Sequence, residues 1–204
     1  MKISHLKRRI FVYLFTVFTC ISLFRFQTIA SQQENALNSH DIHVKGNKLY
    51  FLDKEFDCAI GRNGIIPASE KREGDGKTPT GTYSLVEVWY RPDLTTIETA
   101  LPLHKINSDD GWCDAPDDTN YNKHVKLPYP ASHEELSRTD HVYDTLAVIN
   151  YNYPDAIPGH GSAIFFHIAE QGFSPTAGCI TLKHEDLKYV LKNFSPSAKF
   201  IIEE

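Results

Sequence analysis

The sequence contains little cysteine, no recognisable metal-binding motif and no surplus of positive charge. Only 4 of its 204 residues are cysteine, no two of them form a Cys-x-x-Cys pair, and no HExxH motif occurs. We therefore expect neither a metal nor another cofactor. The 21 Lys and Arg residues are outnumbered by 26 Asp and Glu residues. Because nucleic-acid binding requires clustered basic side chains, nucleic acid is not an expected partner.

Internal repeats and low-complexity tracts are also absent. The composition, with 41% hydrophobic and 23% charged residues, is that of a globular protein and excludes wholesale disorder. A chain of this length fits one domain with a short appendage.

The amino-terminal 30 residues predict a leader. They hold five basic and no acidic residues, and an apolar run of 15 residues extends from Ile10 to Phe24. That run is shorter than the roughly 20 residues needed to span a bilayer. The small residues Thr28 and Ala30 then occupy the positions that a signal peptidase reads. We expect residues 1–30 to be a signal peptide, or else an uncleaved N-terminal anchor, and the remainder to be exported.

Beyond the leader, residues 31–40 are polar and predict a flexible tether. The body is expected over residues 41–204 as one domain. The 174 residues after the leader carry 16 basic and 26 acidic side chains, so they are clearly acidic. Such a body should have little attraction for a negatively charged membrane surface, and no integral-membrane part is expected beyond the possible anchor.

The body shows short runs with a period of two, which is typical of β-strands. Few stretches have helical spacing, so we expect a mostly-β sandwich or barrel with one or two short helices. One helix is expected over residues 184–193, and a short second one where Ser132 and Glu135 resemble a capping box. Residues 61–81 and 91–130 are expected to be long connections. The expected strands cover residues 42–44, 49–52, 56–60, 83–90, 144–150, 162–169 and 200–202.

Removing Cys20 with the leader leaves three cysteines, which is an odd number. In an oxidising compartment, an odd cysteine either pairs with another chain or remains a free, reactive thiol. Cys58 and Cys113 could form a disulfide, although sequence alone does not show that they meet. Cys179 lies in a loop that enters a strand, directly after Gly178.

His167 lies twelve residues before Cys179, in the predicted strand 162–169. If the segment after Gly178 pairs back on that strand as a hairpin, the imidazole lies beside the thiol. A nearby imidazolium would favour the thiolate and then protonate a leaving amine. The backbone N–H groups of Gly178 and Cys179 could stabilise an oxyanion. Each residue alone also fits a structural role in the core.

Four segments of the body stand out together: CAIGRNGI from Cys58, KREGDGKTPTGTYSL from Lys71, DGWCDAPDD from Asp110 and HGSAIFFHIAEQGFSPTAGCITL from His160. They resemble, in the same order, segments of the L,D-transpeptidase (YkuD-like) family of cell-wall enzymes, and the similarity extends from about Ile42 to Phe200. Several motifs in the right order are more specific than one.

The resemblance implies an L,D-transpeptidase-like fold in which Cys179 is the nucleophile and His167 is its general base and acid. It implies peptidoglycan stem peptides as substrates, and therefore a location in the periplasm or cell envelope. Cys179 would form a thioester that an amine of a neighbouring stem resolves into a cross-link. Thr181 stands where well-studied members usually have Arg, which leaves the residue that places the substrate open.

Several further residues are candidates to contact the substrate. Gly178 and Thr176 belong to the cysteine turn, and the Arg62 turn could wall the groove together with the loop 71–79. Trp112 would be either a lid or a hydrophobic plug, and His160 either an assisting group or a turn residue.

Three alternatives remain open on sequence alone. The same thioester delivered to water would make an L,D-carboxypeptidase or stem-trimming hydrolase. A non-catalytic wall-binding module would not need the thiol. A disulfide-exchange protein is disfavoured by the missing Cys-x-x-Cys pair.

Overall fold

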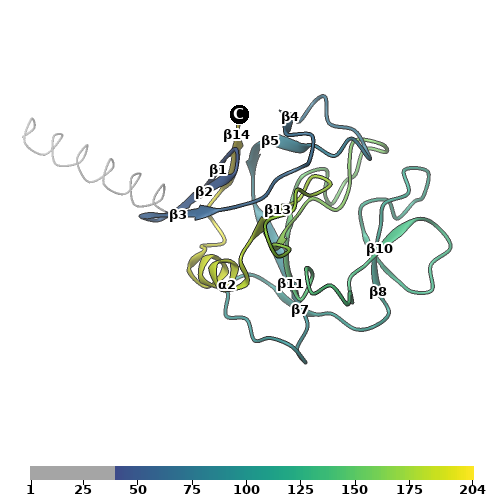
Figure 1. Ribbon diagram of the computed structural model, residues 1–204. Helices are drawn as coiled ribbons and strands as arrows, with labels where there is room; N and C mark the ends of the chain where they lie inside the picture. The colour runs from purple at the N-terminus through teal and green to yellow at the C-terminus, as the bar shows by residue number, and fades with distance from the viewer. Residues whose placement is uncertain (1–39) are drawn as a thin grey trace, which may run out of the picture. The chain divides into compact units, whose positions relative to one another are not determined.

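A computed structural model describes residues 40–204; the predicted leader and nearly all of the predicted tether lie outside these residues. The described residues form three β-sheets and one helix, which confirms the prediction of a mostly-β fold (Figure 1). No helix in this part of the chain has the length and apolar character to cross a membrane.

The largest sheet joins the two ends of the described chain. Its order is β3-β2-β1-β14-β5-β4, and β1 pairs in parallel with the last strand, so that Ile42 is the register partner of Phe200. One of its strands, at residues 65–67, and the first part of another, at residues 78–83, lie in the segment 61–81, which the sequence analysis expected to be a connection. The strands are β1 (Ile42–Lys45), β2 (Lys48–Phe51), β3 (Lys54–Asp57), β4 (Ile65–Pro67), β5 (Thr78–Tyr83) and β14 (Phe200–Glu203).

A five-stranded sheet carries the segments that the sequence marked as chemically active. Its order is β13-β12-β11-β6-β7, with β12 antiparallel to β11 and parallel to β13. The strands are β6 (Leu85–Tyr90), β7 (Leu103–Lys105), β11 (Thr145–Ile149), β12 (Phe165–Ile168) and β13 (Ile180–Leu182). β6, β11 and β12 lie within predicted strands, and β13 is the strand that the Cys179 loop enters. β7 lies in the segment 91–130, which was expected to be a connection.

A small third sheet occupies part of the region that was expected to be irregular. It consists of β8 (Asp110–Cys113), β9 (His124–Lys126) and β10 (His133–Glu135), in the order β10-β8-β9. In Figure 1 it lies on the far side of the molecule from the helix. The helix predicted at Ser132–Glu135 is wrong. No apolar helical period follows Glu135, and residues 133–135 instead pair with residues 111–113 of β8.

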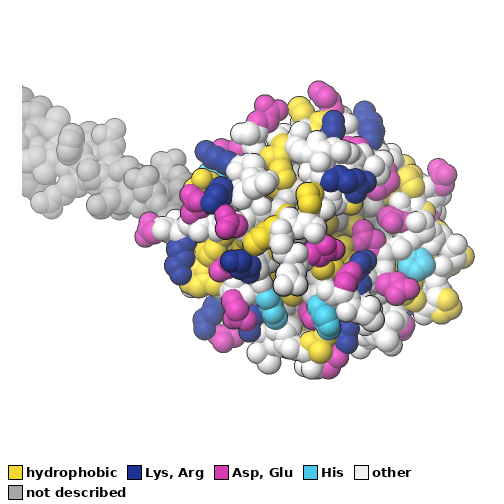
Figure 2. All heavy atoms as spheres, viewed as in Figure 1, with side chains coloured by type: hydrophobic (Ala, Val, Ile, Leu, Met, Phe, Trp, Pro, Cys, Tyr) yellow, Lys and Arg dark blue, Asp and Glu magenta, His cyan; other side chains and the backbone are white. Residues whose placement is uncertain are grey.

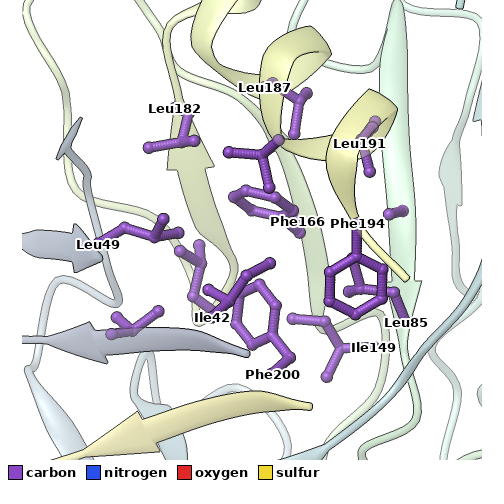
Figure 3. Packing of buried hydrophobic residues seen from close by; sticks show 14 of the residues in the cluster. Ile42, Leu49, Leu85, Ile149, Phe166, Leu182, Leu187, Leu191, Phe194 and Phe200 are labelled. Carbon is purple, nitrogen blue, oxygen red and sulfur yellow. The ribbon is translucent and has the colours of Figure 1, made fainter. Parts of the chain in front are cut away.

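The predicted helix 184–193 is confirmed as α2 (His184–Asn193), and it covers one face of the five-stranded sheet. Leu187, Val190 and Leu191 recur at helical spacing and are all fully buried. They pack into a core with side chains from both larger sheets, among them Phe166 and Phe200 (Figure 3). The period-two alternation of β12 therefore sends Phe166 to this core.

The opposite face of the five-stranded sheet forms a second core with the small sheet. Phe165 of β12 lies in it, edge-on to Trp112 of β8 with ring centroids 5.1 Å apart. Cys179 belongs to the same cluster. Neighbouring residues of β12 thus contribute to two cores, and the Cys179 thiol lies on the Phe165 side.

Candidate active site

Cys179 ends the turn that enters β13, and His167 lies on the adjacent strand β12. These strands are parallel, with His167 the register partner of Thr181, so the expected hairpin is wrong. A parallel pair requires the longer crossover through residues 169–179. Because side chains alternate along a strand, Cys179, Thr181 and His167 nevertheless share one face of the sheet.

The cysteine turn is fastened to the strand β5 by the hydroxyl of Thr78. This hydroxyl donates to the carbonyl of Gly178 at 2.9 Å and accepts from the backbone N–H of Gly61 at 2.8 Å. Gly178 has φ of +148°, and a Cβ atom there would lie 2.8 Å from the carbonyl oxygen of Lys77. Glycine is therefore required at this position for both conformation and space.

Thr176 fastens the turn from within. Its hydroxyl donates to the carbonyl of Cys179 at 2.7 Å and accepts from the N–H of Gly178 at 3.0 Å. Its own backbone is held by Ile60 and Arg62. Since the N–H of Gly178 is occupied in this way, the N–H of Cys179 is the better candidate for an oxyanion donor.

The thiol of Cys179 is buried, with 6% of the residue exposed. Its Sγ donates to the carbonyl of Ala163 at 3.1 Å and accepts from the N–H of Phe165 at 3.4 Å. Burial, followed by the charge of Glu134, raises the pKa of the thiol to about 12. The resting side chain is therefore a thiol, not the thiolate that the sequence analysis expected.

His167 is equally buried, at 7% exposed. Its Nδ1 lies 3.0 Å from the carbonyl oxygen of Ile168 and 3.2 Å from that of Val142. Because carbonyl oxygens only accept hydrogen bonds, Nδ1 carries the proton and Nε2 is the free basic nitrogen. Burial lowers the pKa of the imidazole to about 4, so it is neutral at pH 7.

Both residues line one cavity of about 340 Å³. Within the described residues, no hydrogen bond joins Sγ to the imidazole; Sγ is held instead by the backbone of residues 163 and 165. The cavity brings together five separated parts of the chain. Its other lining residues include Arg62, Lys71, Glu73, Glu134, Arg138, Tyr143, Ser162, Glu170, Thr176, Gly178 and Thr181.

One wall of the cavity consists of charged residues from the loop 71–79, as the sequence analysis expected. Lys71 is a buried cation, 2% exposed, and its Nζ lies 2.7 Å from Oδ1 of Asp75. Glu73 accepts from the hydroxyl of Ser162 at 2.6 Å and from that of Tyr121 at 2.5 Å. These bonds fix the segment that precedes β12 against the loop.

Another wall, which contacts His167, is formed by β10 of the small sheet and by the residues that follow it. The ring of Tyr143 stands edge-on to the imidazole of His167, with centroids 4.9 Å apart at 87°. The Tyr143 hydroxyl donates to Oε2 of Glu134. Burial raises the pKa of the Glu134 carboxyl, and burial together with the charge of Glu134 raises that of Tyr143.

The structure does not bring all of the predicted site residues together. Arg62, Thr176 and Gly178 line the cavity with Cys179 and His167, whereas Trp112 and His160 do not. Trp112 is fully buried behind Phe165, with its Nε1 donating to Asn122 at 2.9 Å, and so fills the core rather than covering the site. His160 lies in the turn before Gly161.

Sequence reasoning missed Glu134, Arg138 and Tyr143, which lie in a segment without clear periodicity. It also left the state of the other thiols open. All three cysteines of the described chain are free and buried, so Cys58 and Cys113 do not form a disulfide. In this part of the chain, no cluster of three or more His, Cys, Asp or Glu side chains is arranged to hold a metal ion.

The mostly-β domain therefore gathers a thiol and an imidazole in one cavity. Comparison with protein families gives a match to the L,D-transpeptidase catalytic domain (YkuD) over residues 38–202, and the chain belongs to this family. It is thus an enzyme of the L,D-transpeptidase family, with peptidoglycan as its class of substrate. Comparisons with curated proteins and with solved structures gave no match.

Proposed function

We propose that this protein is a cysteine-dependent L,D-transpeptidase that forms peptidoglycan cross-links through a thioester on Cys179. The observation that carries the proposal is the placement of Cys179 and His167 on one face of β12 and β13, in a single cavity. Peptidoglycan lies outside the cytoplasmic membrane, so the proposed leader at residues 1–30 would deliver the domain to the cell envelope.

The first half-reaction starts from a neutral pair. As Sγ attacks the carbonyl carbon of the diamino acid in a tetrapeptide stem, Nε2 of His167 takes the thiol proton. The oxyanion that forms would be stabilised by the N–H of Cys179. Collapse of this intermediate breaks the C–N bond, and His167 gives its proton to the departing amine of D-alanine.

The second half-reaction reverses these roles. The amine of a neighbouring stem attacks the thioester carbonyl, its proton passes to His167, and the C–S bond breaks. The sulfur then recovers the proton from the imidazolium. A neutral resting pair suits both halves, because the imidazole is a free base before each attack.

Intact-protein mass spectrometry of the full-length protein with tetrapeptide muropeptides tests this mechanism. We expect an acyl adduct on the wild type that is absent in Cys179→Ala and strongly reduced in His167→Ala. Cys113→Ala is the matched control, since this free, buried thiol does not line the cavity and its loss should leave the adduct unchanged.

The products identify the acceptor. Cross-linked dimers would support transfer to an amine, whereas tripeptides alone would reassign the enzyme as a hydrolase that uses the same thioester. An adduct that persists in Cys179→Ala would contradict the proposed nucleophile.

A further inference from the structure

Glu134 is a carboxylate without a counter-ion in the same cavity as the thiol. Only one hydrogen bond reaches its carboxylate from the described residues, namely the bond from the Tyr143 hydroxyl to Oε2. Its Oε1 has no hydrogen-bond partner among the described residues, and this oxygen is not fully buried. One oxygen is therefore fixed in orientation while the other is open to the cavity.

No cation of the described residues forms an ion pair with this carboxylate. The guanidinium of Arg138 lies over the Tyr143 ring, 5.2 Å from its centroid, and forms its ion pair with Asp140, so its charge only partly offsets the raised pKa of Glu134. Lys71, the buried cation of the loop 71–79, is paired with Asp75. Among the described residues, Glu134 takes part in no ion pair.

The position of Glu134 relates it to the reacting pair. Tyr143, which holds Oε2, also contacts His167 edge-on at 4.9 Å. After burial, the charge of Glu134 is the largest contribution that raises the pKa of the Cys179 thiol. Glu134 is thus connected to His167 through Tyr143 and shares the cavity with Cys179, whereas the Arg62 backbone pairs with Thr176.

An unpaired carboxylate in a partly desolvated cavity gains most from a cationic ligand, because its charge is poorly screened there. A primary ammonium is the cation that the acyl acceptor of the proposed reaction carries. We propose that Glu134 is the binding residue for the ammonium group of the acyl acceptor and so sets the partition of the thioester between amine and water. This inference rests on the proposed function.

The proton balance follows from the same placement. The acceptor arrives as an ammonium ion and must lose one proton before its nitrogen can attack. Glu134, whose carboxylate becomes a better base through burial, takes this first proton and leaves a neutral amine beside the thioester. The second proton passes to His167 as the C–N bond forms and the C–S bond breaks, and His167 returns it to the sulfur. Glu134 then releases the first proton to solvent.

The test measures the partition of a preformed acyl-enzyme in the full-length protein. With tetrapeptide as both donor and acceptor, the ratio of dimer to tripeptide should fall about tenfold or more in Glu134→Gln, equivalent to about 1.4 kcal/mol. Hydroxylamine, which is uncharged at neutral pH, should release the acyl group from wild type and variant at similar rates. The second readout separates loss of ammonium binding from damage to the site.

Two further variants control the result. Glu135→Gln removes the neighbouring exposed carboxylate of β10, which does not line the cavity, and should leave the ratio unchanged. Tyr143→Phe keeps the Glu134 charge but removes the bond that orients it, and should lower the ratio by less than Glu134→Gln does.

The two proposals fail in different ways. If the acyl adduct forms and Glu134→Gln retains the wild-type ratio, the inference about Glu134 is overturned while the thioester mechanism stands. An equal loss with hydroxylamine would also overturn it, because Glu134 would then act on the site as a whole. If the wild type forms no adduct, the proposed function fails and this inference fails with it.

Discussion

The hydroxyl of Thr78 donates a 2.9 Å hydrogen bond to the carbonyl of Gly178, a residue 100 positions later in the chain. The same oxygen accepts from the N–H of Gly61. One buried side chain of β5 thus holds the turn that carries the Cys179 thiol. It also holds the segment 58–65, the first motif of the resemblance, beside that turn. The stability of the fold and the placement of the proposed nucleophile, Cys179, therefore depend on a common contact.

Thr78→Val should destabilise the protein by about 2–3 kcal/mol, because it leaves a buried N–H and a buried C=O without partners. Urea unfolding followed by fluorescence measures this loss. Thr80→Val, two residues along the same strand, is the control, since the Thr80 hydroxyl makes no hydrogen bond with any of residues 40–204. An equal effect of both substitutions would contradict the proposed role of Thr78.

Gly178→Ala should slow acylation of Cys179 strongly, because the new Cβ would lie 2.8 Å from the carbonyl oxygen of Lys77 and displace the turn. The rate of adduct formation by mass spectrometry measures the effect. Gly172→Ala is the matched control. Gly172 also has positive φ, +88°, but no atom lies within 4 Å of its added Cβ. If both variants slow acylation equally, the close contact with Lys77 is not the cause of the effect.

Lys71→Met should cost about 3 kcal/mol of unfolding free energy, because it leaves the carboxylate of Asp75 without its buried partner. The double variant with Asp75→Asn should recover part of that loss. Lys48→Met provides the comparison. Lys48 contacts two carboxylates, those of Glu55 and Asp57, but its side chain is 44% exposed. We therefore expect no resolvable change in the unfolding midpoint of Lys48→Met. Equal losses at both sites would show that burial of Lys71 is not decisive.

Stability should fall as the pH is lowered from about 6.5 to about 4. Burial lowers the pKa of folded His167 to about 4, so in this interval the unfolded chain binds the proton and the folded chain does not. The contribution is fully present above the unfolded pKa and amounts to about 3 kcal/mol over the interval.

The comparison with His167→Gln isolates this group. The difference in unfolding free energy between wild type and variant should shrink by about 3 kcal/mol between pH 7 and pH 4. Carboxyl groups such as Asp110, whose pKa is lowered to about 2, titrate equally in both proteins, so their contributions cancel in the difference. A difference that stays constant with pH would mean that the imidazole is not held neutral.

The elements with strict periodicity could be predicted from the sequence. The helix 184–193 and the strands that contain Phe165 and Ile149 follow from apolar spacing, because each contributes its regular face to a core. The cysteine turn could be located because Gly178 and Cys179 stand at the start of a strand.

The small sheet and the wall at Glu134 could not be predicted in this way. β8, β9 and β10 have three or four residues each, too few to show a period of two, and their pairing joins residues 111–113 to residues 133–135. Glu134 gains its significance only from the cavity that this pairing creates. The capping-box pattern of Ser132 and Glu135 predicts a helix locally, but pairing of residues 133–135 with β8 overrides this preference.

Because Cys58, Cys113 and Cys179 are free thiols, the chain must fold before these thiols are oxidised. Each sulfur is sheltered by the finished fold, so the native protein resists oxidation without any crosslink of its own. Before folding, the same three thiols are open to one another and to oxidants. A chain that reached an oxidising compartment unfolded would have to fold faster than its thiols form wrong disulfides. Rapid formation of the β-sheets would bury Cys179, the proposed nucleophile, before it could be oxidised.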